Sequence, residues 1–207
     1  MSWREAPATA VLAVVTVVAS LLILLFGALP YWTVQAGFIP ARVGEAVAGL
    51  WLPWVLTPLS ATLVHGGWAH LLFNLVMLGY CGREVERALG AGGLLALYGV
   101  GAFAAAAGQW AAGPDVAAPM IGASGAISAV VGAYALLFGE RRAKAWGPLP
   151  ADLVHVLWLA AGWIGVQLLI GATGAAGAPI AIAAHIGGFL AGLALARPLL
   201  LWRWRGA

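Results

Sequence analysis

Charged side chains are too scarce in this sequence to keep a folded surface dissolved in water. The 207 residues include ten basic and seven acidic ones, so 8% are charged, whereas 63% are hydrophobic and the mean hydropathy is +0.98. Soluble domains carry about 25% charged residues. The composition therefore excludes a soluble globular protein and a disordered chain. It predicts a polytopic integral membrane protein that has the lipid bilayer as its solvent.

The composition also excludes several kinds of partner and site. The isoelectric point near 9.5 rests on only ten basic residues, which are too few to form a stripe along nucleic acid phosphates. The single cysteine, Cys81, excludes a disulfide framework and any multi-cysteine metal cluster. We therefore expect no nucleic acid partner, no metal and no cofactor.

Six apolar runs approach the length that a membrane-spanning helix requires, which is about 20 residues. They cover residues 8–29, 68–83, 90–111, 122–139, 152–171 and 181–201. Pro30 is expected to end the first run. The intervening segment 31–64 is amphipathic, and its tryptophans suit the lipid headgroup zone. Because no domain linker is visible, the chain is predicted to be one membrane domain over residues 1–207.

The basic residues indicate how the six runs are oriented. If the N-terminus is cytoplasmic, every basic residue except Arg42 falls in an inner segment, with the densest cluster at Arg141, Arg142 and Lys144. Cytoplasmic segments of membrane proteins carry an excess of Lys and Arg. The pattern therefore favours an even number of spans, with both the N- and the C-terminus in the cytoplasm.

Four polar side chains lie in runs where lipid makes them costly, which marks a candidate functional site by default. They are His70 and Asn74 in the second run, Ser124 at the start of the fourth, and His185 near the start of the sixth. At a rise of about 1.5 Å per residue, all four are expected in the outer half of the bilayer. His70 and Asn74, four residues apart, share one helix face.

Small residues recur every four positions on the fourth and sixth runs, which lets two helix backbones approach closely. These two stripes are Gly125, Ala129 and Ala133, and Ala184, Gly188 and Gly192. Such an approach would let His185 reach Ser124, the arrangement of an activated nucleophile and its base. His70, Asn74 and the backbone N–H groups at the start of the fourth helix would supply donors for an oxyanion.

Each of these features, taken alone, has a simpler structural explanation. A lone serine in a membrane helix usually bonds the backbone one turn back, and a lone histidine or asparagine often bonds a neighbouring helix. A Gly-x-Ser-Gly sequence is a weak pattern in a chain with 29 glycines. It is the conjunction of all four polar residues at one depth that favours catalysis.

Around these residues the sequence resembles the rhomboid intramembrane serine proteases, in their compact six-helix bacterial form. The resemblance rests on four segments, namely His-Gly-Gly-Trp-Ala-His-Leu-Leu-Phe-Asn at 65–74, Gly-Arg-Glu-Val-Glu-Arg-Ala-Leu-Gly at 82–90, Gly-Ala-Ser-Gly at 122–125 and Ala-His-Ile-Gly-Gly at 184–188. Each motif is moderately specific, and four in this order with matching topology are strong. The resemblance covers nearly all of the chain and implies a six-transmembrane-helix rhomboid-like bundle.

The resemblance implies a role for each polar residue. Ser124 would be the nucleophile and His185 the general base, in a dyad without a carboxylate. His70, Asn74 and the backbone N–H of Ser124 would form the oxyanion hole. Gly122 would let its loop approach the substrate backbone.

Other segments would support the site. Gly125 and Gly188 would allow close helix packing, and Glu86 would satisfy backbone groups near the turn after the second helix. By the same resemblance, the fifth span and the loop 172–180 would form the gate and cap through which a substrate enters, and 31–64 would lie in the outer leaflet.

The sequence departs from the family pattern at two places. The first loop lacks the Trp-Arg pair that members often carry, because Val55 follows Trp54 and the only arginine is Arg42. Ser128 stands where many members have a tyrosine that packs on the base, so something else must orient that base.

Two further histidines, His65 and His155, are interpreted as interfacial. By the same resemblance, His65 matches a family histidine near the mouth of the active site, so a functional role for it is an equal alternative. His155 forms with Asp152 a pair that resembles part of a triad, but its predicted depth is on the cytoplasmic side.

The function implied is an intramembrane serine endopeptidase of the bacterial inner membrane, a multi-pass protein whose substrates are single-span membrane proteins. A zinc protease needs His-Glu-x-x-His, and no histidine here is followed by glutamate. An aspartyl protease needs two adjacent intramembrane aspartates, and Asp115 and Asp152 are predicted at opposite faces. A channel or transporter, a weaker alternative, would carry charged residues at mid-membrane, and none is predicted there in this chain. The remaining alternative is a catalytically weak or inactive rhomboid-like protein that binds and escorts membrane proteins.

Overall fold

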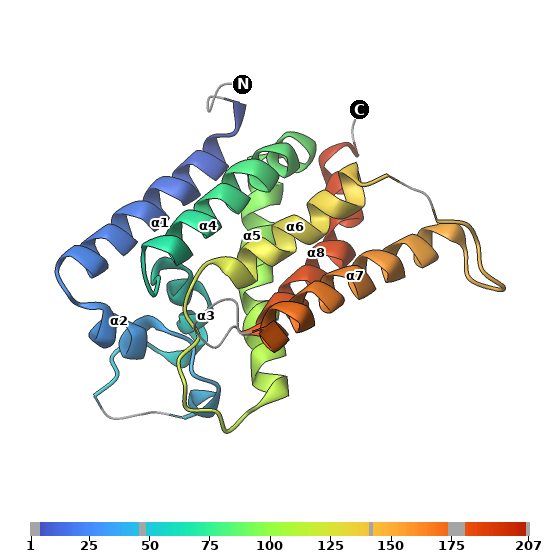
Figure 1. Cartoon of the computed structure of the whole chain (residues 1–207). Coiled ribbons are helices and arrows are strands. Elements are labelled where there is room, and N and C mark those ends of the chain that lie inside the picture. Colours follow the sequence, from blue (N-terminus) through green and yellow to red (C-terminus); the bar gives the residue numbers. More distant parts are fainter. Residues whose placement is uncertain (1–4, 46–48, 141–142, 174–180, 206–207) are drawn as a thin grey trace.

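The computed structural model describes residues 5–45, 49–140, 143–173 and 181–205. Within these ranges every regular element is a helix, and the only β pairings are two isolated bridges, Phe38 with Met120 and Trp146 with Leu149. The prediction of an all-α fold is confirmed. Figure 1 shows the long helices gathered into one bundle, with the short helices of the first loop at one end.

Each predicted apolar run contains most of one long helix, although the ends of the first two runs differ from the helix ends. They are α1 Pro7–Leu25, α4 Trp68–Met77, α5 Arg83–Ala112, α6 Ser124–Phe138, α7 Ala151–Thr173 and α8 Ile182–Arg203. Among the described residues, four helical stretches are long and apolar enough to cross a membrane: Pro7–Leu25, Trp68–Ala112, Ala151–Leu169 and Ile182–Trp204. Helix α6 is shorter, at 15 residues, or about 22 Å at the α-helical rise.

The 45-residue stretch Trp68–Ala112 turns back on itself at Gly90. A π-helical turn, Leu78–Gly82, joins α4 to α5, and the helix then continues past Arg83 up to the break. Gly90 has φ 77° and ψ 166°, a left-handed conformation that favours glycine. The prediction that the second run ends at residue 83 is therefore wrong. Figure 1 shows the chain reversing direction between α4 and the rest of α5.

Glu86 explains why a charged residue is tolerated in this stretch. Its buried carboxylate accepts hydrogen bonds from the backbone N–H groups of Ala8 and Thr9, at 2.9 and 2.8 Å, and from the Thr9 hydroxyl at 2.7 Å. The first N–H groups of a helix lack intrahelical partners and favour negative charge. The resemblance implied a structural role for Glu86, and the backbone groups that it binds belong to the N-terminus of α1.

The first helix ends earlier than the sequence predicted. Helix α1 stops at Leu25, and Gly27 follows with φ 64°. Pro30 lies in the first turn of the next helix, α2 Leu29–Ala36. The prediction that Pro30 terminates the first helix is wrong, because proline is well tolerated at the start of a helix, where its missing N–H has no intrahelical partner.

The rest of the first loop consists of short helical turns. These are η2 Pro40–Arg42, η3 Trp54–Leu56, α3 Thr57–Ser60 and η4 Ala61–Leu63. The Arg42 side chain is buried and donates hydrogen bonds to the carbonyl oxygens of Leu52 at 3.0 Å and Val34 at 3.5 Å. Arg42 therefore ties the two sides of the loop together without a Trp-Arg pair.

The predicted close packing of α6 against α8 is present. A Cβ atom added to Gly188 would lie 2.1 Å from the carbonyl oxygen of Gly125, and one added to Gly192 would lie 2.1 Å from that of Ala129. Gly187 makes a similar contact with the backbone of α5. These distances leave no room for a side chain, so α8 touches α5 and α6 backbone to backbone.

Candidate active site

Ser124 and His185 meet where α6 and α8 begin. Ser124 is the first residue of α6, and His185 lies in the first turn of α8, three residues before Gly188. The Ser124 Oγ and His185 Nε2 atoms are 2.7 Å apart. Both residues are only partly buried. The glycine contact between the two helices therefore brings together a hydroxyl and an imidazole that a reactant can still reach.

Two residues of α7 hold the other side of His185. The Gln167 Oε1 atom is 2.8 Å from His185 Nδ1, and the Trp163 indole N–H donates to the His185 carbonyl oxygen at 3.3 Å. The Trp163 ring also stacks on Phe189, with centroids 4.9 Å apart. The sequence reasoning missed both α7 residues. The signal that could have found Gln167 is its position as a polar residue inside the apolar fifth run.

Ser128, one turn after Ser124, takes no part in orienting the imidazole. Its hydroxyl donates to the backbone carbonyl of Ser124 at 2.8 Å, which is the usual bond of a serine inside a helix. The contacts with His185 that a tyrosine at this position would make come instead from α7.

His70 and Asn74 lie on α4, which approaches the loop before α6. The buried Asn74 side chain donates to the His70 carbonyl oxygen at 2.9 Å, and His70 Nδ1 accepts from the Gly66 N–H at 3.4 Å. The His70 ring lies against Gly122, two residues before Ser124. In the described part of the chain, neither side chain hydrogen-bonds to Ser124 in this state.

Gly122 is needed both for its backbone and for the space it leaves. Its φ is 107°, and a Cβ atom there would lie 2.5 Å from His70 Nε2. Gly122→Ala is expected to strain the loop by about 1–3 kcal/mol and to displace His70 from the site. The measurement is the rate of cleavage of a model membrane substrate together with the thermal unfolding midpoint. Wild-type turnover in the alanine variant would contradict this reading of the loop.

His65 joins α1 to the residue before Ser124. The Ala123 N–H donates to His65 Nε2 at 3.4 Å, His65 Nδ1 is 2.9 Å from the Ser20 hydroxyl, and that hydroxyl donates to the Leu63 carbonyl at 3.1 Å. The His65 side chain is fully buried within the protein, and its interfacial depth in the membrane stays a prediction. Burial, followed by the charge of neighbouring His70, lowers the pKa of His65 to about 4. The neutral ring can therefore accept the Ala123 N–H.

His155 and Asp152 do not form part of a triad. Asp152 pairs with Arg197 of α8 at 2.7 Å. His155 is buried within the protein, and its Nε2 has no hydrogen-bond partner among the described residues. The expectation that this pair has no catalytic arrangement agrees with the geometry.

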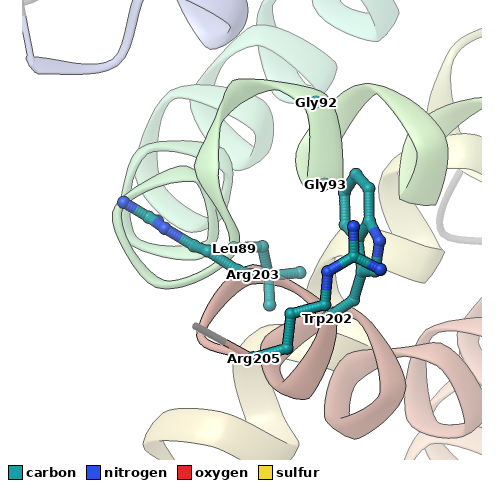
Figure 2. Close-up of a pocket in the computed structure, with 6 residues that line it drawn as sticks. All are labelled: Leu89, Gly92, Gly93, Trp202, Arg203 and Arg205. Carbon is teal, nitrogen blue, oxygen red and sulfur yellow. The ribbon is translucent and has the colours of Figure 1, made fainter. Parts of the chain in front are cut away.

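A basic hollow lies where α8 ends beside the Gly90 turn. Figure 1 shows this end of α8 at the opposite end of the bundle from the start of α6. Figure 2 shows the residues that line it, which are Leu89, Gly92, Gly93, Trp202, Arg203 and Arg205. The Arg203 guanidinium donates to the Glu86 carbonyl at 3.2 Å, and that of Arg205 lies over the Trp202 ring at 5.5 Å. The two arginines therefore contact the residues of the turn and of the end of α8. None of the residues that line the hollow belongs to the serine site.

Within the ranges that the structure describes, no group of three His, Cys, Asp or Glu side chains is arranged to hold a metal ion. The predicted cap loop, 172–180, lies for the most part outside the described residues, as do Arg141 and Arg142 of the predicted inner loop. The chemistry that the described site can perform is that of a serine hydroxyl hydrogen-bonded to an imidazole.

Comparison with known proteins adds to this geometry. A family model described as a rhomboid domain matches residues 54–202. A protein named Rhomboid protease GlpG from Pectobacterium atrosepticum is 35% identical over 140 residues, which is 66% of this chain and 46% of that protein. Proteins of the same name from Yersinia enterocolitica and Serratia proteamaculans are each 32% identical over 165 residues, or 74% of this chain and 55% of theirs. The chain thus spans about half the length of the curated relatives it matches.

Proposed function

This chain belongs to the rhomboid family, and we therefore propose that it is an intramembrane serine endopeptidase. The observation that carries the proposal is the 2.7 Å distance between Ser124 Oγ and His185 Nε2 on two helices locked together by glycines. Ser124 is assigned as the nucleophile and His185 as the general base. Gly122, Gly125 and Gly188 support the site through the close contacts described above.

The proposed reaction proceeds through an acyl-enzyme. His185 Nε2 takes the hydroxyl proton as Ser124 Oγ attacks the scissile carbonyl carbon, and the imidazolium then gives that proton to the leaving amine. In the second half, His185 takes a proton from water as the resulting hydroxide attacks the acyl carbon. The bond between the acyl carbon and Ser124 Oγ then breaks, the new C-terminal carboxyl product leaves, and the imidazolium returns the proton to Ser124 Oγ. Both residues are partly exposed, which is consistent with water reaching the site.

Three donors are assigned to the oxyanion that forms during attack. The backbone N–H of Ser124 lies at the first turn of α6, where the helix dipole favours negative charge. His70 lies against Gly122. Asn74 uses one N–H of its amide on the His70 carbonyl, and an amide has two. The second N–H is the one we assign to the oxyanion.

Asn74→Ala is expected to lower the turnover number by up to about 10²–10³-fold, the loss typical of one oxyanion donor. The Michaelis constant should change little, because an oxyanion donor acts mainly in the transition state. The measurement is steady-state cleavage of a fluorogenic membrane substrate in detergent or vesicles. An unchanged turnover number would remove Asn74 from this role.

The proposed substrates are single-span membrane proteins cut in or beside their transmembrane helix. A helix in lipid satisfies its own backbone hydrogen bonds, so it must unwind before its carbonyl can be attacked. Residues that weaken a helix near the cut should therefore help cleavage. A model substrate with a glycine introduced beside its cleavage site should be cut faster than the parent.

Placement in the membrane belongs to the same proposal. The family and the apolar helices make this an integral membrane protein. We assign it to a bacterial inner membrane as one six-span domain over residues 1–207, with both termini in the cytoplasm. This is supported by the first turn of α1 and the last turn of α8, which lie at the same end of the bundle (Figure 1).

A fluorophosphonate probe, which reacts covalently with an activated serine, tests the proposed function against the escort alternative. The purified protein should be labelled at Ser124, and prior heat denaturation should prevent labelling. A folded wild-type protein that neither labels nor cleaves any membrane substrate would favour the escort function. The pairing of Ser124 with His185 favours the protease, because a protein that only binds clients needs neither.

A further inference from the structure

The side chain of Gln167 completes a chain of three polar groups. Gln167 Oε1 lies 2.8 Å from His185 Nδ1, and His185 Nε2 lies 2.7 Å from Ser124 Oγ. The three groups come from three different helices, α7, α8 and α6. The Gln167 side chain has only 5% of its surface exposed. Because the amide is buried, its oxygen bonds to the imidazole instead of to water.

The direction of the hydrogen bonds determines what this amide does. A carbonyl oxygen only accepts, so with the amide oxygen on Nδ1 the His185 proton is on Nδ1 and the Nε2 lone pair faces Ser124. That is the tautomer a general base requires. With the amide reversed, its N–H would face Nδ1, the proton would move to Nε2, and Ser124 would meet a donor instead of a base.

A neutral amide also suits the location of the site. An aspartate or glutamate at this point of α7 would have to be ionised inside a membrane helix, which is costly. An amide orients the ring without that cost, and because the amide itself does not titrate, its acceptor oxygen is present throughout the pH range in which His185 is neutral. The Trp163 indole, one turn earlier on α7, fixes the backbone of His185 from the same side.

We propose that Gln167 is the positioning residue of the site, holding His185 in the tautomer and orientation that accept the proton of Ser124. It fills the place that the carboxylate has in a Ser-His-Asp triad, and the role left open by Ser128 in place of an aromatic residue. The proposal rests on the proposed function, because it assigns His185 as the base.

The first test replaces Gln167 with methionine, which keeps an unbranched side chain of similar size but removes the strong acceptor. The turnover number for a membrane substrate should fall by about 10–100-fold, the usual loss when a partner that orients a functional histidine is removed. The Michaelis constant should stay near that of the wild type. A Gln109→Met variant is the matched control, since the Gln109 Oε1 atom has no hydrogen-bond partner among the described residues; its turnover should be unchanged.

The second test reads the imidazole directly. In protein labelled with ¹⁵N histidine, the nitrogen shifts of His185 should report Nδ1–H in the wild type and a mixture of tautomers in Gln167→Met. A Gln167→Glu variant, which keeps the acceptor oxygen, should retain more activity than the methionine variant. Its acid limb of activity should move to higher pH, because a carboxylate stabilises the imidazolium. His70, the other titratable group acting on His185, is common to all variants and cancels in the comparison.

The outcomes separate this proposal from the proposed function. An active wild type with unchanged turnover and an unchanged tautomer in Gln167→Met overturns the role of Gln167 and leaves the protease assignment intact. If the methionine variant fails to fold, nitrogen shifts of the wild type that report the proton of His185 on Nε2 overturn it instead. An inactive wild type that no serine probe labels overturns the proposed function, whatever tautomer the nitrogen shifts report.

Discussion

Ser124→Ala is expected to reduce cleavage of a model membrane substrate to the uncatalysed background. A serine protease that loses its nucleophile loses turnover by a factor on the order of 10⁶. Alanine removes one oxygen from a partly buried side chain, so the thermal unfolding midpoint should stay close to that of the wild type. The measurements are product formation on a gel over long incubation and thermal unfolding in detergent.

Ser128→Ala is the matched control for this experiment. It removes the same hydroxyl one turn further along α6, where the group only bonds the backbone carbonyl of Ser124. Cleavage by this variant should remain close to the wild-type rate, and fluorophosphonate labelling should persist. Cleavage by Ser124→Ala at more than background, in a preparation free of other proteases, would end the assignment of Ser124 as nucleophile.

Gly188→Val is expected to cause the second large loss of activity, because the added side chain would separate α8 from α6, and the contact of these helices brings Ser124 to His185. The first added carbon would lie 2.1 Å from the Gly125 carbonyl oxygen and 3.3 Å from the Ser128 Cβ atom. Neither group is a flexible side-chain end, so α8 must move away from α6. Overpacking of this kind costs about 1–3 kcal/mol or more. A shift of about 1 Å between reacting groups costs about 10² in rate.

The measurement for Gly188→Val is turnover and the unfolding midpoint, compared with Gly99→Ala. Gly99 also lies inside a long helix, but an added Cβ there meets nothing within 4 Å. Alanine at Gly99 should leave activity unchanged and stability equal or slightly higher, because glycine costs about 1 kcal/mol in a helix interior. Full activity in Gly188→Val would mean that close contact of α6 and α8 is not what brings Ser124 to His185.

The helices were predictable because hydropathy and small-residue spacing are local properties of the chain. The fourth, fifth and sixth runs differ from α6, α7 and α8 by about two residues at each end or less, which is within the usual uncertainty of helix ends. The errors arose where a charged or cyclic side chain was read as a terminator. Pro30 begins a helix instead of ending one. The helix also continues past Arg83, and Glu86 is tolerated in its next turn because the carboxylate accepts hydrogen bonds from the N-terminus of α1.

The site was predictable only in part, for a physical reason. Ser124 and His185 could be found because each interrupts an apolar run at the same depth, and because glycines nearby allowed the helices to meet. Gln167 interrupts a run in the same way, but the predicted small-residue stripes join only the fourth and sixth runs, so no local spacing identified His185 as its partner. The burial of His65 was not predictable for the same reason, since its hydrogen-bond partner Ser20 belongs to α1 and lies far away in the sequence.

The sequence by itself determined that this chain lives in a bilayer, that it does so as helices, and that serine and histidine are the polar groups worth testing. The low content of charged residues and the local hydropathy pattern decide those points, because neither depends on contacts between helices. Only the tertiary structure decided that Glu86 caps α1 and that Gln167 reaches His185. Hydrogen-bond partners depend on distances between helices, and the glycines that set those distances act through backbone contacts across the bundle.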